Sequence, residues 1–250
     1  MVDGWNFNGS PENESALRPL CEKVEQYLEP PAARLCRYFA VSDDTNLRDN
    51  CQEYYRGFYC PISERGWLLL DLQQCFFHPL NQFTACSFNS FDEMVAFEHL
   101  IYIRASTCAD PTGCVTTYAH ELQHLVQHER TPKLFTVNNV LYKNLKRCEP
   151  TATAIDVPSE REANIVSKRI AEAVCGVRAV REFAEKQIHE MEALGSIENR
   201  DRWVFFRDAA PLTSYDLVEH TRILIERYKD VIDFGIDVGQ PEWWHGAVEK

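Results

Sequence analysis

The feature of this sequence that most constrains its fold is the segment 116–130, TTYAHELQHLVQHER. It places two histidines four residues apart with a glutamate directly after the first: His120, Glu121 and His124. On an α-helix, residues four apart lie about 40° from one another around the axis and one turn apart along it, so both imidazoles can reach one ion. Glu121 is rotated by about 100° and projects beside that ion. The spacing therefore predicts a helix that carries two metal ligands and one catalytic carboxylate.

An apolar stripe accompanies this motif. The residues that form it are Val115, Ala119, Leu122, Leu125 and Val126. The stripe borders the histidine face, so the imidazoles are expected at the margin of the core, where an unpaired polar ring costs free energy. Thr116 or Thr117 is expected to cap this helix, which should run to about residue 129.

A catalytic zinc site normally uses three protein ligands, so a third donor is required. The longer motif with a third histidine ten residues after the first does not apply, because position 130 is Arg and the expected Gly at 127 is Gln. His128 lies a further turn along the axis, too far to share the ion, and is expected to be a surface residue.

The third donor is expected from the segment PSEREANIVSKRIAE, which opens a second helix. Glu160 and Glu162 both stand at its start. They lie about 200° apart around a helix axis, so only one of them can face a metal ion. From this spacing alone, both glutamates remain candidates.

The chemistry of such a centre follows from its charge. Two neutral imidazoles and one carboxylate leave a zinc ion with net positive charge, which lowers the pKa of a bound water to about 7. Glu121 would take the proton of that water during attack on a carbonyl and pass it to the leaving amine. A side chain that stabilises the oxyanion is also expected, and the candidates by residue type are Tyr142, His189, Tyr215 and His220.

The two motifs TTYAHELQH and EREANIVSKRIA together resemble the zinc peptidases of the ImmA/IrrE type, within the gluzincin group. The resemblance implies His120, His124 and Glu162 as zinc ligands and Glu121 as the base, with Asn164 in contact with a ligand. Gln123 departs from the glycine usual in that family's motif. So do the residues after the E-A-N triplet, namely Ile165, Val166 and Ser167.

The expected fold class is α+β: a small mixed or antiparallel sheet packed on a zincin-type helix pair, with a helical C-terminal part. Strands are expected within residues 54–72 and 94–104, both rich in aromatic and aliphatic residues. A helix is expected over 16–28, with Ser15 as its N-cap. The stretch HLIYIR, residues 99–104, is a candidate for a sheet edge on which a peptide substrate could lie, or else an ordinary core strand.

The expected domain organisation is a flexible segment over 1–14 and one zincin-like metallopeptidase domain over 15–250. Its helical C-terminal extension begins at about residue 177, with helices expected over about 178–194 and 214–233. Residues 131–158 contain three prolines and are expected to be mostly connection, with one short helix between them.

Composition narrows the function classes. A formal net charge of −12 argues against nucleic acid as a direct ligand, because nucleic-acid binders carry a basic surface. The N-terminus has no secretory signal pattern and no apolar stretch is long enough to span a bilayer, so a cytoplasmic protein is expected. The ten cysteines include no C-x-x-C pair, which favours buried reduced thiols.

The leading hypothesis is a zinc-dependent peptidase that hydrolyses a peptide bond through a zinc-bound water activated by Glu121. Its partner would be a protein or peptide substrate, with a regulatory protein as a possible target. Two alternatives remain: a non-proteolytic, metal-stabilised regulatory or binding protein, and a zinc hydrolase of a non-peptide amide.

Overall fold

The computed structural model describes residues 4–6, 11–28, 37–42, 56–61, 99–210, 215–235 and 238. The chain divides into two compact units, Met1–Leu125 and Val126–Lys250. The division falls inside a single helix, α6 (Pro111–Arg130), which contributes its first part to one unit and its last turn to the other.

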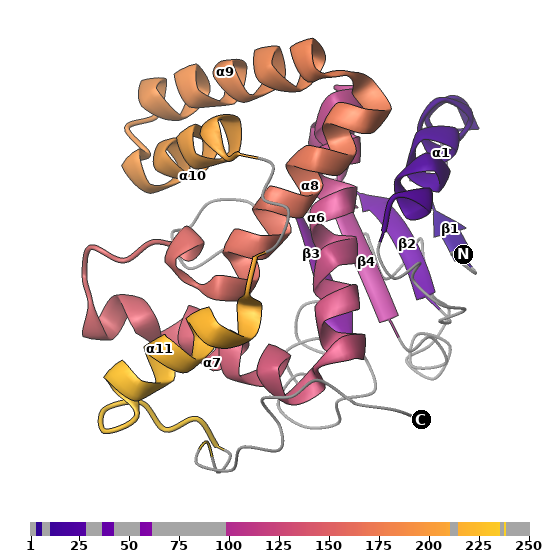
Figure 1. The fold of residues 1–250 in the computed structure, drawn as a ribbon. Coiled ribbons are helices and arrows are strands. Elements are labelled where there is room, and N and C mark those ends of the chain that lie inside the picture. The colour runs from indigo at the N-terminus through magenta and orange to yellow at the C-terminus, as the bar shows by residue number, and fades with distance from the viewer. Residues whose placement is uncertain are drawn as a thin grey trace, which may run out of the picture. The chain divides into compact units, whose positions relative to one another are not determined.

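The first unit contains a sheet of four short strands (Figure 1). They are β1 (Gly4–Asn6), β2 (Arg37–Ser42), β3 (Gly57–Pro61) and β4 (His99–Arg104). Their spatial order is β1-β2-β4-β3, with β2 parallel to both β1 and β4, and β3 antiparallel to β4. The sheet is therefore mixed.

Strand β4 lies inside this sheet. Its residue Ile101 pairs with β2 on one side and with Tyr59 of β3 on the other, and its side chain is fully buried. Because both of its backbone edges are hydrogen-bonded, β4 cannot accept a further strand. The expectation that HLIYIR forms a sheet edge is wrong, and the strand is an ordinary core strand. Residues 54–55, 62–72 and 94–98 of the expected strands lie outside the described residues.

The helices of the first unit are α1 (Pro11–Gln26), the short α5 (Ala105–Cys108) and most of α6. Helix α1 buries Leu17, Cys21 and Val24, which recur at helical spacing. It begins four residues before Ser15, so the expected cap at Ser15 is wrong. The Tyr118 hydroxyl of α6 donates a hydrogen bond of 2.8 Å to Glu25 of α1, which ties the two helices together.

Helix α6 begins earlier than expected. The carboxylate of Asp110 accepts a 2.9 Å hydrogen bond from the backbone N–H of Thr112, and Pro111 occupies the first helical position. An Asp cap followed by Pro is a favourable helix start, because Asp satisfies a free N–H and Pro has none to satisfy. The predicted cap at Thr116 or Thr117 is therefore wrong, while the helical conformation of the motif is confirmed.

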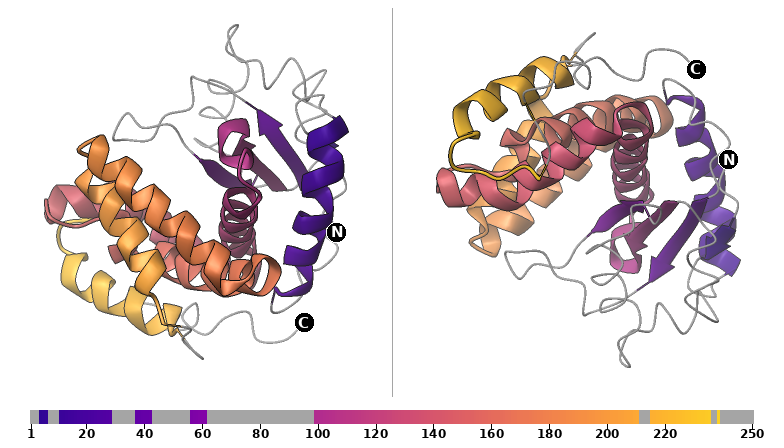
Figure 2. Two further views of the ribbon diagram at one scale, coloured as in Figure 1. Left: turned by 90° about the horizontal axis from the view of Figure 1, so that it is seen from above. Right: turned by 90° about the horizontal axis from the view of Figure 1, so that it is seen from below.

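The second unit is helical throughout its described residues, apart from connections. Its elements are α7 (Pro132–Cys148), the 3₁₀ turn η1 (Ala154–Asp156), α8 (Pro158–Cys175), α9 (Val177–Ala193), α10 (Ile197–Asp208) and α11 (Leu217–Tyr228). Helices α9 and α10 lie side by side in all three views (Figures 1 and 2). Gly176 at the end of α8 has φ +91°, a conformation that favours glycine, so the expected end of this helix is confirmed.

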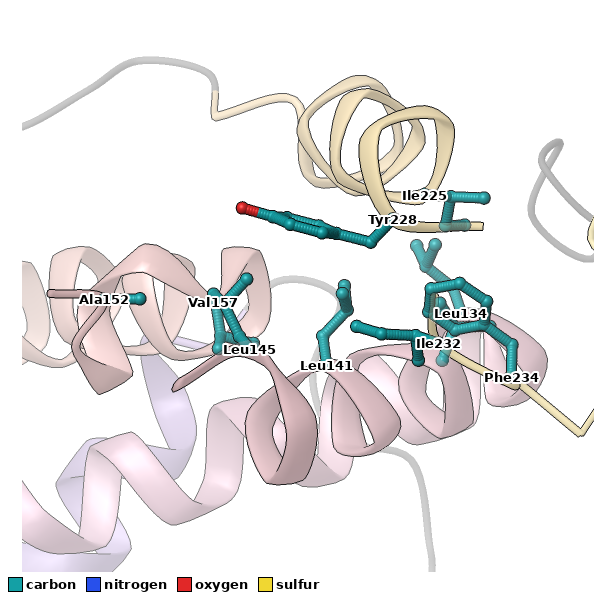
Figure 3. Packing of buried hydrophobic residues seen from close by; sticks show 10 residues of the cluster. Leu134, Leu141, Leu145, Ala152, Val157, Ile225, Tyr228, Ile232 and Phe234 are labelled. Carbon is teal, nitrogen blue, oxygen red and sulfur yellow. The ribbon is translucent and has the colours of Figure 1, made fainter. Parts of the chain in front are cut away.

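Helix α7 replaces the connection expected over residues 131–158. Leu134, Leu141 and Leu145 form a buried stripe on it, and they pack with Ile225 and Tyr228 of α11 (Figure 3). The cluster also includes Val137, Ala152, Val157, Ile232 and Phe234. This core holds α7, α8 and α11 in one unit.

The α+β fold class expected from the sequence is wrong. Of the residues whose side-chain burial the structure describes, 77% are helical and only 4% lie in strands. The described strands have three to six residues each, while six of the helices have twelve to eighteen residues and α6 has twenty. The part of the chain that the structure describes is predominantly helical.

Candidate metal centre

The three residues of the H-E-x-x-H motif are buried on α6. His120, Glu121 and His124 are 6%, 7% and 8% exposed. The apolar stripe predicted beside them is buried as well, with Val115, Ala119, Leu122 and Leu125 fully enclosed and Val126 nearly so. Polar groups at this depth require partners, because their water shell has been removed.

The two histidine rings converge. Their Nε2 atoms lie 3.1 Å apart, and the ring planes meet edge to face at 85° with centroids 4.7 Å apart. Two imidazole nitrogens bound to one tetrahedral zinc at 2.0–2.1 Å would be about 3.3 Å apart, so the observed separation is close to that of a ligand pair. The alternative at this distance is a direct hydrogen bond, in which one ring donates and the other accepts.

Glu121 follows His120 directly in the helix and is buried with it. One helical step of about 100° turns its carboxylate to the side of the imidazole pair. A carboxylate turned to this side of the pair suits proton exchange with a water better than ligation of the same ion.

The two candidate glutamates of α8 have different partners in the second unit. Glu160 forms an ion pair with Arg202 of α10, with 3.6 Å between Oε2 and the guanidinium. Glu162 accepts a 2.8 Å hydrogen bond on its Oε2 from the side-chain amide of Gln127, in the last turn of α6. The two carboxylates therefore point to different elements, as the helical wheel predicts.

Gln127 is a residue whose role the sequence did not reveal. It is 2% exposed, and its amide nitrogen also donates a 2.9 Å hydrogen bond to the backbone oxygen of Ser159 at the start of α8. The backbone N–H of Ser159 is held in turn by the side-chain oxygen of Asn138 at 3.2 Å. Two buried amides thus fix the first turn of α8.

Histidine and glutamate side chains that could hold a metal ion are present among the described residues, and they include His120, His124 and Glu160. His99, His128 and Glu129 are further examples. Imidazole and carboxylate donors suit zinc, and they suit other divalent ions of the first transition row as well. The donor types alone therefore do not select the metal.

His128 differs from its expectation as a surface histidine. It is 7% exposed and packs edge to face on Phe135 of α7, with ring centroids 5.3 Å apart. The amide of Asn164 donates to the backbone oxygen of Glu160 at 2.7 Å. Its side chain stabilises the first turns of α8.

Tyr215 is an expected oxyanion donor whose pKa is influenced by Glu162 of α8. Burial raises the pKa of its phenol to about 12, with Arg161 opposing the rise and Glu162 and Asp216 adding to it. The phenol ring stacks on His220, with centroids 4.5 Å apart. At neutral pH the phenol is therefore protonated and can donate a hydrogen bond.

The other candidates by residue type have different surroundings. Tyr142 packs against the apolar core of the second unit, and His189 is exposed on α9. His220 is exposed and its Nδ1 lies 2.7 Å from the backbone oxygen of Asp216.

The aromatic residues of α10 make two kinds of contact. Trp203 packs edge to face with Phe183 and Phe206, at centroid distances of 5.5 and 5.4 Å. Phe205 carries the guanidinium of Arg161 on its ring face at 5.1 Å. Trp203 and Phe206 therefore have a packing role. Trp243 and Trp244 lie outside the described residues.

Comparison with known proteins adds no identification to this geometry. No protein-family model, curated protein or solved structure matches the chain. The proposed function is therefore based on the chemistry of the residues in the candidate metal centre.

Proposed function

We propose that this chain is a zinc-dependent peptidase whose metal ligands include His120 and His124 and whose general base is Glu121. The observation that carries the proposal is the buried imidazole pair with Nε2 atoms 3.1 Å apart, followed immediately in the helix by a buried carboxylate. A divalent cation is the partner that two buried imidazoles at this separation suit best.

The third ligand in this proposal is Glu162, with Glu160 as the alternative. Glu162 accepts a hydrogen bond on Oε2 from a neutral amide, which adds no positive charge beside the carboxylate. Glu160 already has a cationic partner in Arg202. A carboxylate paired with a guanidinium is the weaker metal donor, because part of its charge is compensated.

Besides the metal ligands, the proposed reaction uses two residues of the chain. Bound zinc supplies a water whose pKa is lowered to about 7 and polarises the scissile carbonyl. Glu121 accepts a proton from the attacking water as the new carbon–oxygen bond forms, and it delivers that proton to the amine as the carbon–nitrogen bond breaks. Tyr215 donates a hydrogen bond to the carbonyl oxygen while negative charge develops there.

The substrate class in this proposal is a peptide or a protein, and a regulatory protein is the candidate target by the resemblance to ImmA/IrrE-type peptidases. We further propose that the protein acts in the cytoplasm. The net charge of −12 makes a basic partner segment more favourable than an acidic one, because opposite charge speeds encounter.

The experiment that tests the proposal compares two variants with the parent protein. Glu121→Gln should keep bound zinc and lower turnover of a peptide library by about 10²–10⁴-fold, because the base is removed while both ligands remain. Tyr215→Phe should also keep zinc and lower kcat by about 10²–10³-fold through loss of one oxyanion donor. Glu192→Gln removes an exposed carboxylate of α9 and serves as the control.

The outcome separates the three hypotheses. Peptide turnover that survives in Glu121→Gln would contradict the proposed mechanism. A parent protein that binds zinc but cleaves no peptide, with partner binding unchanged in Glu121→Gln, would favour a non-proteolytic regulatory protein. Turnover of small amides in place of peptides would favour the non-peptide hydrolase.

A further inference from the structure

The guanidinium of Arg161, in the first turn of α8, lies on an aromatic ring of the same unit. Its Cζ is 5.1 Å from the centroid of the Phe205 ring of α10. Its Nε is buried and makes no hydrogen bond, and within the described part of the chain the guanidinium forms no ion pair. Buried N–H donors are normally satisfied, because they have lost their bonds to water. Arg161 is therefore a cation whose donors are open to a ligand.

Neighbouring cations of the second unit are paired with carboxylates. A guanidinium nitrogen of Arg202 lies 3.6 Å from an oxygen of Glu160. The Nζ of Lys168, two turns along α8, lies 3.4 Å from an oxygen of Glu172. These side chains are half-buried, as Arg161 is. Burial of this degree thus does not prevent pairing here, and the contrast makes Arg161 a candidate for a ligand from outside the chain.

The contact with Phe205 determines which part of the guanidinium a ligand can use. Stacking engages the face of the planar group and leaves its N–H bonds directed outward in the plane. Two parallel N–H bonds of an arginine match the two oxygens of a carboxylate. Both side chains are half-buried, so the guanidinium is supported by an apolar surface without being sealed from solvent.

The charges around Arg161 restrict the kind of anion that it can bind. Burial raises the pKa of the nearby Tyr215 phenol to about 12, while Arg161 lowers it and Glu162 and Asp216 raise it further. Two negative charges therefore act in the same neighbourhood as the guanidinium. Their repulsion of a ligand grows with the charge of that ligand. A singly charged carboxylate is accordingly favoured over a doubly charged phosphate.

We propose that Arg161, supported by the ring of Phe205, is a binding site for a carboxylate group. The site lies entirely within the second unit and requires no metal ion, so it stands or fails independently of the proposed peptidase activity. The carboxylate can be the main-chain carboxylate of a peptide or an acidic side chain, and both present the same planar pair of oxygens.

The test uses the full-length protein and small probes at constant ionic strength, with binding followed by NMR of the arginine Nε–H groups. N-acetylglycine has a main-chain carboxylate, the amide of N-acetylaspartic acid has only a side-chain carboxylate, and N-acetylglycinamide has no charge. At least one carboxylate should bind saturably and shift the Nε–H resonance of Arg161, whereas the neutral amide should not. The carboxylate that binds more tightly identifies the source of the ligand.

Variants examined by calorimetry assign the binding to Arg161. Arg161→Gln should lower the affinity for the preferred carboxylate by about tenfold or more, through loss of a charge-assisted hydrogen bond. Phe205→Leu should lower it by about two- to fivefold, because the ring no longer holds the guanidinium. Arg161→Lys keeps the charge without the planar pair of donors, should also weaken binding, and replaces the first variant if that fails to fold.

The matched control is Arg169→Gln, which removes an exposed cation of the same helix and should leave the affinity unchanged. Equal affinities in Arg161→Gln and the parent protein would overturn the proposal, as would equal losses in Arg161→Gln and Arg169→Gln. Equal binding of N-acetylglycinamide and both carboxylates would show that no carboxylate is recognised. Inorganic phosphate that binds more tightly than either carboxylate would contradict the assigned ligand class.

Discussion

At the scale of single residues, burial keeps the phenol of Tyr215 in its neutral form. Its phenol is partly buried at the start of α11, stacked on His220, and its pKa is raised to about 12 mainly by loss of solvent. A phenol with this pKa stays neutral over the whole range in which a peptidase works. It can therefore donate to a developing oxyanion without the competing loss of its own proton.

The raised pKa of Tyr215 predicts a loss of stability at alkaline pH. A tyrosine in the unfolded chain ionises near pH 10, so its stabilising contribution is complete below that pH and is lost as the pH rises through about 12. Over this window the free energy of unfolding should fall by up to about 3 kcal/mol more in the parent protein than in Tyr215→Phe. Urea unfolding at pH 9 and pH 11.5, followed by tryptophan fluorescence, measures the difference.

The control for this measurement is Tyr27→Phe, which removes an exposed tyrosine of the other unit. It should lose stability with pH as the parent does. Equal pH dependence in Tyr215→Phe and the parent protein would show that the phenol of Tyr215 is not held in its neutral form by folding.

The residue scale also shows what spacing can and cannot reveal about the site. Burial of His120, Glu121 and His124 on one helix was predictable because their geometry depends on neighbours within four residues. The bond from Gln127 to Glu162 spans 35 positions of the sequence. A contact of that range depends on the packing of two helices, which local periodicity does not encode.

At the scale of helices, three prolines begin long helices, although proline in the sequence is commonly a sign that a helix is interrupted. Pro111, Pro132 and Pro158 each stand at the first position of a long helix, α6, α7 and α8. Proline has no N–H and a fixed φ, so it interrupts a helix from within but is well suited to begin one. Because proline also interrupts helices, residues 131–158 with Pro132 and Pro158 were expected to be mostly connection, and the helix of the motif was expected to start only at Thr116 or Thr117.

The core between α7 and α11 provides the sharpest stability test at this scale. Leu141 is fully buried in the cluster of Figure 3, so Leu141→Ala should lower the free energy of unfolding by about 2–5 kcal/mol through lost burial and a new cavity. Val231→Ala truncates a side chain that is 70% exposed and should change it by less than about 0.5 kcal/mol. Urea titration followed by circular dichroism measures both.

One result of the urea titrations would contradict this prediction. Equal stabilities for Leu141→Ala and Val231→Ala would mean that α7 does not pack on α11 through this stripe. The start of α8 would then lack the support of Asn138, which lies on α7 and binds both Ser159 of α8 and Thr221 of α11.

At the scale of the whole molecule, the sequence pattern predicted a larger share of sheet than the described residues contain. Aromatic and aliphatic runs predicted strands, and β3 and β4 formed within two of those runs, but the described strands are short and the helices carry most of the described chain. The helical nature of the C-terminal third was predictable from its apolar periodicity, although α10 was not foreseen. No helix in the part of the chain that the structure describes is both long and apolar enough to cross a membrane.

For the whole molecule, we propose above all that it holds a zinc ion on His120 and His124. The most direct measurement is the zinc content of the purified protein by elemental analysis, for the parent, His124→Ala and the control His189→Ala, which removes an exposed histidine. We expect about one zinc ion per chain in the parent and the control. We expect little zinc in His124→Ala, because a zinc site rarely survives the loss of one of three ligands. The same zinc content in all three proteins would contradict it.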